Sequence, residues 1–110
     1  MHPALVEAAS AVRRDLRTPA HEQAVHDAVE QRAWWLSEWE AGAPYVLGLL
    51  AQDVQEAVHA VDPTWPPCLE TSCAERFAHP MFVEPDLGTD PFWTCSRTGL
   101  PVAPIGRLGS

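Results

Sequence analysis

The fold of this chain depends on residues 62–80, which read DPTWPPCLETSCAERFAHP. The segment opens with Asp62-Pro63, and proline both ends a helix and holds the preceding residue in an extended conformation. Eight of the eleven prolines in the 110-residue chain lie from Pro63 onward, and no helical period continues past that point. The segment therefore divides the sequence into a helical part, residues 1–62, and a proline-rich part, residues 63–110.

The helical part carries three apolar stripes with the 3.6-residue period of amphipathic helices. They predict helices over residues 3–17, 19–40 and 44–61. Thr18 is a residue type that caps helices, and the prolines at 19 and 44 suit a first helical turn. Because the connections between these helices are short, the sequence predicts a three-helix bundle.

The proline-rich part contains three short extended stretches, at residues 81–83, 92–94 and 101–108. Turn signals centred on Gly88 and Gly99 separate them. Such a segment holds too few large apolar side chains to form a core of its own, so it needs either a cross-link or a surface to pack on.

All three cysteines of the chain lie in this proline-rich part. Cys68 and Cys73 are separated by four residues, His79 follows after five more, and Cys95 after a further fifteen. Thiolate and imidazole are the preferred ligands of structural zinc, which binds four of them in a tetrahedron. The sequence therefore predicts one Zn ion bound by Cys68, Cys73, His79 and Cys95, and the α+β class. The predicted architecture is an N-terminal three-helix bundle, residues 1–62, with a small C-terminal zinc-stapled β-ribbon, residues 63–110, packed on it.

Three alternatives to this zinc site remain open at the level of sequence. The thiols could carry no metal and pack as small hydrophobic groups, or Cys68 and Cys73 could form a disulfide. If Cys73 is not a ligand, Cys68, His79 and Cys95 leave a fourth position open, and the protein becomes a small zinc-dependent enzyme.

The segment from Cys68 to Cys73 resembles the first knuckle of a zinc ribbon with a lengthened spacer. Residues 95–99 resemble a second knuckle in which Thr98 replaces the later cysteine. The likeness covers residues 65–108 and departs from the usual Cys-x2-Cys pair at both knuckles. The segments at 79–81, 93–95 and 104–108 also resemble the zinc-ribbon-like tails of small uncharacterised actinobacterial proteins. The zinc-ribbon resemblance implies that His79 supplies the missing ligand, and the resemblance to these tails implies no activity.

The composition argues against binding to phosphate-rich partners. The chain has 15 acidic residues, seven arginines and no lysine, which gives a formal charge of −8. Nucleic acid and anionic membranes are therefore disfavoured partners. A nucleic-acid-binding zinc ribbon stays as a second alternative, with only Arg76, Arg97 and Arg107 to supply its positive charge. With no secretory signal or bilayer-spanning run in the sequence, we expect a cytoplasmic location, where thiols stay reduced.

Several large apolar side chains do not fit the predicted core stripes. Trp35 and Trp39 fall on the stripe of the second helix, but Trp34 points about 180° away from it. Tyr45 and Leu49 are off the stripe of the third helix. One interpretation is that the proline-rich part folds back over Trp34, Tyr45 and Leu49.

The other interpretation is a contact surface for a protein partner or for a second copy in a homodimer, since such surfaces are rich in Trp and Tyr. The candidate partner-binding residues are Trp34, Trp39, Tyr45 and Leu49. The sequence thus favours a small zinc-binding adaptor or interaction module over an enzyme.

Overall fold

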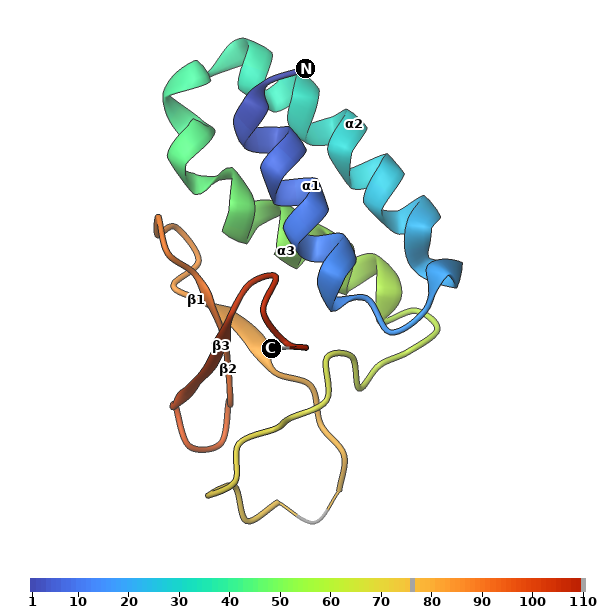
Figure 1. The fold of residues 1–110 in the computed structure, drawn as a ribbon, viewed down its shortest axis with the longest axis vertical. Helices are drawn as coiled ribbons and strands as arrows, with labels where there is room; N and C mark the ends of the chain where they lie inside the picture. The colour runs from blue at the N-terminus through green and yellow to red at the C-terminus, as the bar shows by residue number, and fades with distance from the viewer. Residues whose placement is uncertain (76, 110) are drawn as a thin grey trace.

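A computed structural model describes residues 1–75 and 77–109 of the chain, so the prediction made for Arg76 lies outside the described residues. The described part contains three α-helices at one end and a three-stranded antiparallel sheet beside them (Figure 1). The helices are α1 (Pro3–Asp15), α2 (Glu22–Glu38) and α3 (Val46–Val58). The strands are β1 (Phe82–Glu84), β2 (Phe92–Thr94) and β3 (Pro101–Pro104). The predicted α+β class, with helices first and sheet second, is confirmed.

The predicted helices are present, but their ends differ from the prediction. Helix α1 stops two residues early, because Leu16 takes an extended conformation with ψ of 138°. Two short 3-10 helices, Pro19–His21 and Glu40–Tyr45, lead into α2 and α3 and shorten both at their starts. The Thr18 hydroxyl caps the first of them by accepting a hydrogen bond from the Ala20 N–H at 3.3 Å. Short 3-10 turns are common at helix ends and share the residue types of helix starts, which is why the prediction merged them with the helices.

The two parts of the chain share one hydrophobic core. Leu5 and Val12 of α1, Val25 of α2, and Leu50 and Val54 of α3 are fully buried. The same cluster of buried side chains includes five residues of the proline-rich part: Trp65, Met81, Val83, Trp93 and Ile105. The proline-rich part therefore buries its apolar side chains against the helices, as a segment without its own core must.

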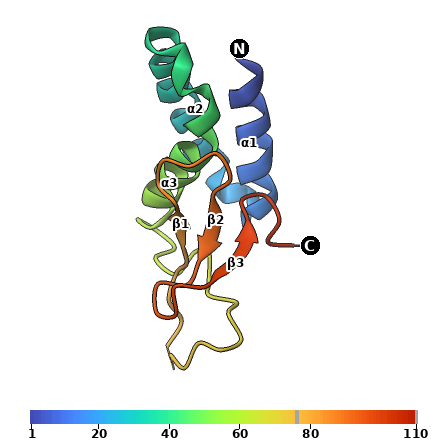
Figure 2. The same ribbon diagram turned by 90° about the vertical axis from the view of Figure 1, so that its left-hand side faces the viewer.

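The sheet has the order β1-β2-β3, and one of its faces lies against the helices (Figure 2). Val83, Trp93 and Ala103 occupy paired positions across the three strands, and all three are buried. Gly48 of α3 faces the loop before β2, where a Cβ would lie in van der Waals contact with Pro91, at 3.4 Å. The β2 prediction is confirmed, whereas β1 begins one residue later and β3 ends four residues earlier than predicted.

Asp15, the last residue of α1, ties the helices to the proline-rich part. Its buried carboxylate accepts hydrogen bonds from the Trp93 indole at 2.8 Å, from the Gly106 N–H, and from the Leu108 N–H at 3.1 Å. Its backbone carbonyl accepts a fourth from the Trp65 indole at 3.0 Å. The two indoles meet edge to face with ring centres 5.4 Å apart. Four hydrogen bonds thus join one residue to three separate segments.

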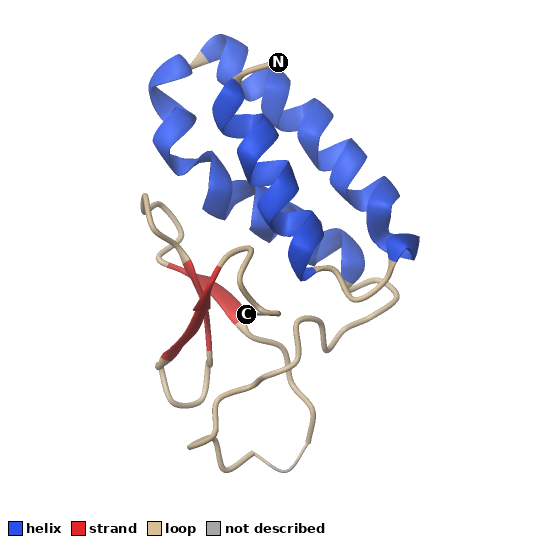
Figure 3. Cartoon of the chain, viewed as in Figure 1, coloured by secondary structure: helices blue, strands red, loops and turns tan. Residues whose placement is uncertain are grey.

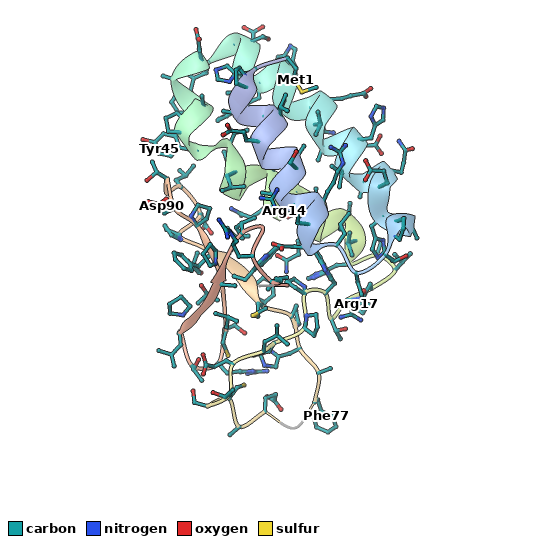
Figure 4. All side chains as sticks on the ribbon, in the orientation of Figure 1. Met1, Arg14, Arg17, Tyr45, Phe77 and Asp90 are labelled. Atoms are coloured by element: carbon teal, nitrogen blue, oxygen red, sulfur yellow. The ribbon has the colours of Figure 1, made fainter. Side chains whose placement is uncertain are left out.

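Arg14 adds a contact at the same junction, because its Nε donates to the Gly106 carbonyl at 3.2 Å (Figure 4). Gly106 has φ of 94°, a value that L side chains rarely adopt, and a Cβ there would come within 2.9 Å of the Ala11 Cβ. A glycine is therefore required where the chain passes over α1.

The expectation that the proline-rich part covers Trp34, Tyr45 and Leu49 is wrong for Trp34, whose side chain is 67% exposed. The contacts of Asp15 draw the proline-rich part to the end of α1 instead. Tyr45 and Leu49 are half-buried. Trp39, predicted on the core stripe, is 48% exposed because α2 ends at Glu38 and the helical face does not extend to it.

Candidate metal centre

The four side chains predicted to bind metal converge on one point. The sulfur atoms of Cys68, Cys73 and Cys95 and a ring nitrogen of His79 all lie within 4.8 Å of one another. Three of these residues belong to the long loop that connects α3 to β1, and Cys95 belongs to the turn between β2 and β3 (Figure 3). The group therefore connects two segments that are distant in sequence.

The long loop brings its own three ligands together through backbone hydrogen bonds. The Cys68 N–H donates to the His79 carbonyl at 2.9 Å, and the Met81 N–H donates to the Pro66 carbonyl at 2.8 Å. These bonds align the two ends of the loop in antiparallel fashion. Between them, the Cys73 N–H donates to the Glu70 carbonyl at 3.1 Å and turns the chain back toward His79. Cys68, Cys73 and His79 thus lie close together because hydrogen bonds join the two ends of the loop that carries them.

The turn that follows β2 presents Cys95 to this loop. The Cys95 carbonyl accepts from the Gly99 N–H at 2.8 Å, and Gly99 has φ of 73°. Positive φ of this kind favours glycine in the turn of a hairpin. The Thr98 N–H donates to the Cys95 sulfur at 3.4 Å. Thr98 occupies the position where the zinc-ribbon resemblance expects a second cysteine, and it donates a hydrogen bond to the Cys95 sulfur instead.

The imidazole of His79 is oriented by its backbone surroundings. Its Nδ1 lies 3.2 Å from the Pro80 carbonyl, which can only accept, so Nδ1 carries the proton. The other nitrogen, Nε2, lies 3.3 Å from the Cys73 sulfur, and in the tautomer with the proton on Nδ1 it presents a lone pair to the cysteines. A carbonyl that fixes the tautomer of a histidine in this way is a usual feature of metal sites.

The thiols of Cys95 and Cys68 have pKa values shifted in opposite directions. Hydrogen bonds from the side chain and the backbone of Thr98 lower the pKa of Cys95 from 9.0 to about 6, against the effect of burial. Burial, together with the neighbouring Cys95, raises the pKa of Cys68 to about 11. One sulfur thus favours the thiolate while its neighbour holds a proton. A cation among them would allow both to ionise, since metal ligation favours the thiolate.

The geometry fits a tetrahedral metal ion. With bonds of about 2.3 Å to sulfur and about 2.0 Å to nitrogen, ligand atoms around zinc lie about 3.7 Å apart. The distance of 3.3 Å between Cys73 and His79, within a group whose members all lie within 4.8 Å, is close to that arrangement. All three cysteines are free, so the alternative disulfide between Cys68 and Cys73 is not formed. The Cys3His group is positioned for metal binding.

The structure brings together two of the four candidate partner-binding residues. The rings of Trp39 and Tyr45 are stacked with their centres 6.5 Å apart, and Trp39 also meets Trp35 edge to face at 5.3 Å. Gly42 makes room for this cluster, since a Cβ there would lie 2.4 Å from the Trp35 ring. Trp34 lies on the outer side of α2, and Leu49 lies half-buried on α3.

No pattern in the sequence identifies the residues that join the two parts of the chain. Asp15 follows two arginines at the end of a helix, which is the pattern of a solvated surface. Trp65 and Trp93 read as ordinary apolar residues, and nothing local indicates that both indoles donate to Asp15. Only the tertiary structure shows that these residues place Cys68 and Cys95, their near neighbours in sequence, beside one another.

Comparison with known families places the whole arrangement in one group. The model of a domain of unknown function, DUF8819, matches residues 1–105, so the chain belongs to this family. The match includes the helices and all four residues of the Cys3His group. No curated protein and no solved structure matches the chain. In the described part of the chain, no helix has both the length and the apolar character needed to span a bilayer.

Proposed function

We propose that the protein is a small interaction module with one structural zinc ion bound by Cys68, Cys73, His79 and Cys95. The convergence of these four donor atoms is the observation that carries the proposal. Three thiolates and one imidazole in a tetrahedron favour zinc over the hard cations, which prefer oxygen ligands.

The number of protein ligands supports a structural role rather than a catalytic one. A catalytic zinc keeps one position for water or substrate, whereas structural zinc binds four protein side chains. Cys73, whose participation decides between the two, lies 3.3 Å from the ligand nitrogen of His79. The alternative of a small enzyme requires that Cys73 leave the metal.

The proposed role of the zinc is to fix the loop between α3 and β1. From Leu69 to Ala78 this loop contains no helix or strand in its described residues, and Leu69 and Phe77 are exposed. Phe77 lies at its tip, far from the helices (Figure 4). The ion pair between Glu75 of this loop and Arg97, at 3.3 Å, connects the loop to the turn after β2, and a metal bond from Cys95 would add a second connection at the same turn. This arrangement supports the zinc-ribbon resemblance, and zinc-bound thiolates suit a reducing, cytoplasmic location.

The proposed contact residues for a partner protein are Trp34, Trp39, Tyr45 and Leu49, of which Trp39 and Tyr45 are in contact with each other. Their support is the exposure of two tryptophans, 67% for Trp34 and 48% for Trp39. Tryptophan side chains often supply the largest part of the binding energy in protein interfaces. A phosphate-rich partner is disfavoured by the charge of −8.

Metal analysis of two histidine variants tests the zinc proposal. The protein, purified without added metal, should contain one zinc per chain, and a chelator should lower its melting temperature. His79→Ala should lose most of this zinc. Removing a group that only hydrogen-bonds to a metal ligand already weakens metal binding about tenfold, so removing a ligand should weaken it more. His26→Ala, which removes an exposed histidine of α2, should keep it. A wild-type protein without zinc, with a melt insensitive to chelator, would contradict the proposal.

A further inference from the structure

Trp34 is the most exposed tryptophan of the chain. Its side chain is 67% exposed, whereas Trp65 and Trp93 are 1% and 0% exposed. It lies on the side of α2 opposite Leu36, which is buried in the core. A large apolar ring held on a well-formed helix with so much surface in water is a suitable anchor for a partner.

Carboxylates lie on both sides of this ring along the helix. Glu30 and Glu38 are one turn before and one turn after Trp34, and Asp27 is two turns before it. All three are exposed. We call the surface formed by Asp27, Glu30, Trp34 and Glu38 the outer face of α2. Residues at these spacings share one side of a helix, so the indole lies within a row of negative charges.

The arginines of the protein do not neutralise this row. Arg32, the one arginine in α2, is directed elsewhere and binds both carboxylate oxygens of Asp53, at 2.6 and 3.0 Å. Within residues 1–75 and 77–109, no ion pair joins an arginine to Asp27, Glu30 or Glu38. The imidazole of His26 contacts this row, with its Nε2 3.3 Å from a carboxylate oxygen of Glu30.

A neighbouring part of α2 shows how a cation binds to such a combination of groups. The guanidinium of Arg32 lies 5.1 Å from the ring centre of Trp35 while it pairs with the carboxylate of Asp53. An aromatic face together with a carboxylate is a favourable environment for a guanidinium. Trp34 with Glu30 and Glu38 offers the same two groups to a cation from outside the chain.

We propose that the outer face of α2 binds a cationic segment of a partner protein, with an arginine or lysine side chain stacked on Trp34. The inference rests on the proposed interaction role and specifies the chemistry of the partner. Basic residues of the segment pair with Asp27, Glu30 and Glu38. The row from Asp27 to Glu38 covers twelve residues, a rise of about 17 Å along the helix, which an extended segment of about five residues spans.

A second copy of the chain is a poor occupant of the same face. A two-fold interface brings identical patches together, so each carboxylate of the row would meet the carboxylates of the other copy. Opposed like charges weaken association, and each chain carries a formal charge of −8. A basic partner has the complementary charge.

Titration with a hexa-arginine peptide, capped at both ends, tests the proposal. The indole N–H signals of uniformly 15N-labelled protein are followed by NMR as the peptide is added. The Trp34 signal should shift and saturate, while the signals of Trp65 and Trp93, both buried and bonded to Asp15, should not. Trp34→Ala should weaken binding about 2- to 5-fold through the lost cation–π contact. The double change Glu30→Gln with Glu38→Gln should weaken it at least about threefold through two lost ion pairs.

Glu84→Gln is the matched control, because it removes an exposed carboxylate on β1, away from α2. The inference would be overturned if Glu84→Gln weakened peptide binding as much as the double change does. It would also be overturned if Trp34→Ala bound the peptide as tightly as the wild-type protein. Self-association in sedimentation experiments that Trp34→Ala abolishes would also overturn it, in favour of a second copy. Zinc is measured in the same samples. Zinc-loaded protein that does not bind the peptide contradicts this inference alone, and zinc-free protein that binds it contradicts the zinc proposal alone.

Discussion

Replacement of Asp15 by asparagine tests how strongly the two parts of the chain are joined. The asparagine has nearly the same shape as the aspartate but offers one acceptor oxygen and one NH2 group. The three partners of the Asp15 side chain are all donors: the Trp93 indole and the N–H groups of Gly106 and Leu108. In either orientation of the amide, its NH2 group faces at least one N–H.

The cost follows from these contacts. Trp93 and Gly106 share one carboxylate oxygen, so the best orientation of asparagine keeps those two bonds and loses the bond from Leu108. A hydrogen bond to a charged group contributes about 1.5–3 kcal/mol, and the two that remain become neutral and weaker. Part of this loss is offset because a neutral amide costs less to bury than a carboxylate. We expect Asp15→Asn to destabilise the protein by about 3 kcal/mol, or about 13 °C in melting temperature for a chain of this length.

Urea unfolding followed by circular dichroism and by tryptophan fluorescence measures this cost. Asp27→Asn is the matched control, since it makes the same chemical change at an exposed position of α2 and should cost less than about 0.5 kcal/mol. Equal midpoints for the two variants would refute the account of Asp15 as the junction of the fold.

Three further predictions concern the turn over α1, the thiols and the shared core. Gly106→Ala should lower the free energy of unfolding in urea by about 2 kcal/mol or more, and by more than Gly99→Ala does. Both glycines have positive φ, but only at Gly106 would a new Cβ have atoms of Ala11 and Arg14 within 3.1 Å. Equal costs for the two substitutions would contradict this. In metal-free protein, the lowered pKa of Cys95 means that the unfolded chain binds more protons than the folded chain between pH 6 and 9, so stability rises with pH there. The raised pKa of Cys68 makes stability fall between pH 9 and 11. Urea midpoints measured across this range check both directions, and a flat profile would contradict them. Cys95→Ser should lower the midpoints seen by circular dichroism and by fluorescence together, because Met81 and Trp93 share the core with the helices; two separate transitions would show that the parts unfold independently.

The sequence predicted the elements of this fold better than their contacts. The apolar stripes located three helices, because the 3.6-residue period survives in any sequence whose helix buries one face. The helix ends were less accurate, since Thr18 and Pro44 belong to 3-10 turns that use the same residue types as helix starts. The position of the proline-rich part over α1, instead of over Trp34, depends on hydrogen bonds to Asp15 from residues 50 to 93 positions away. No local pattern records such contacts.

The Cys3His group was predictable for a different reason. Zinc uses few residue types, and this chain has only three cysteines, all in the segment that lacks a core. Two of the groups that contact these side chains were not predictable, because the Pro80 carbonyl and the Thr98 N–H act through the backbone, although the Thr98 side chain also lowers the pKa of Cys95. Any residue type can supply a carbonyl or an N–H, so the sequence carries no mark of their role.

The central claim is that Cys68, Cys73, His79 and Cys95 together bind one zinc ion. X-ray absorption at the zinc edge of the purified protein tests it most directly, with zinc content measured in the same sample. The account predicts one zinc per chain with three sulfur ligands at about 2.3 Å and one nitrogen ligand at about 2.0 Å. A spectrum with two sulfur ligands and a bound water would mean that Cys73 or another cysteine is not a ligand, and it would favour an open, catalytic metal. The absence of zinc would contradict the claim altogether.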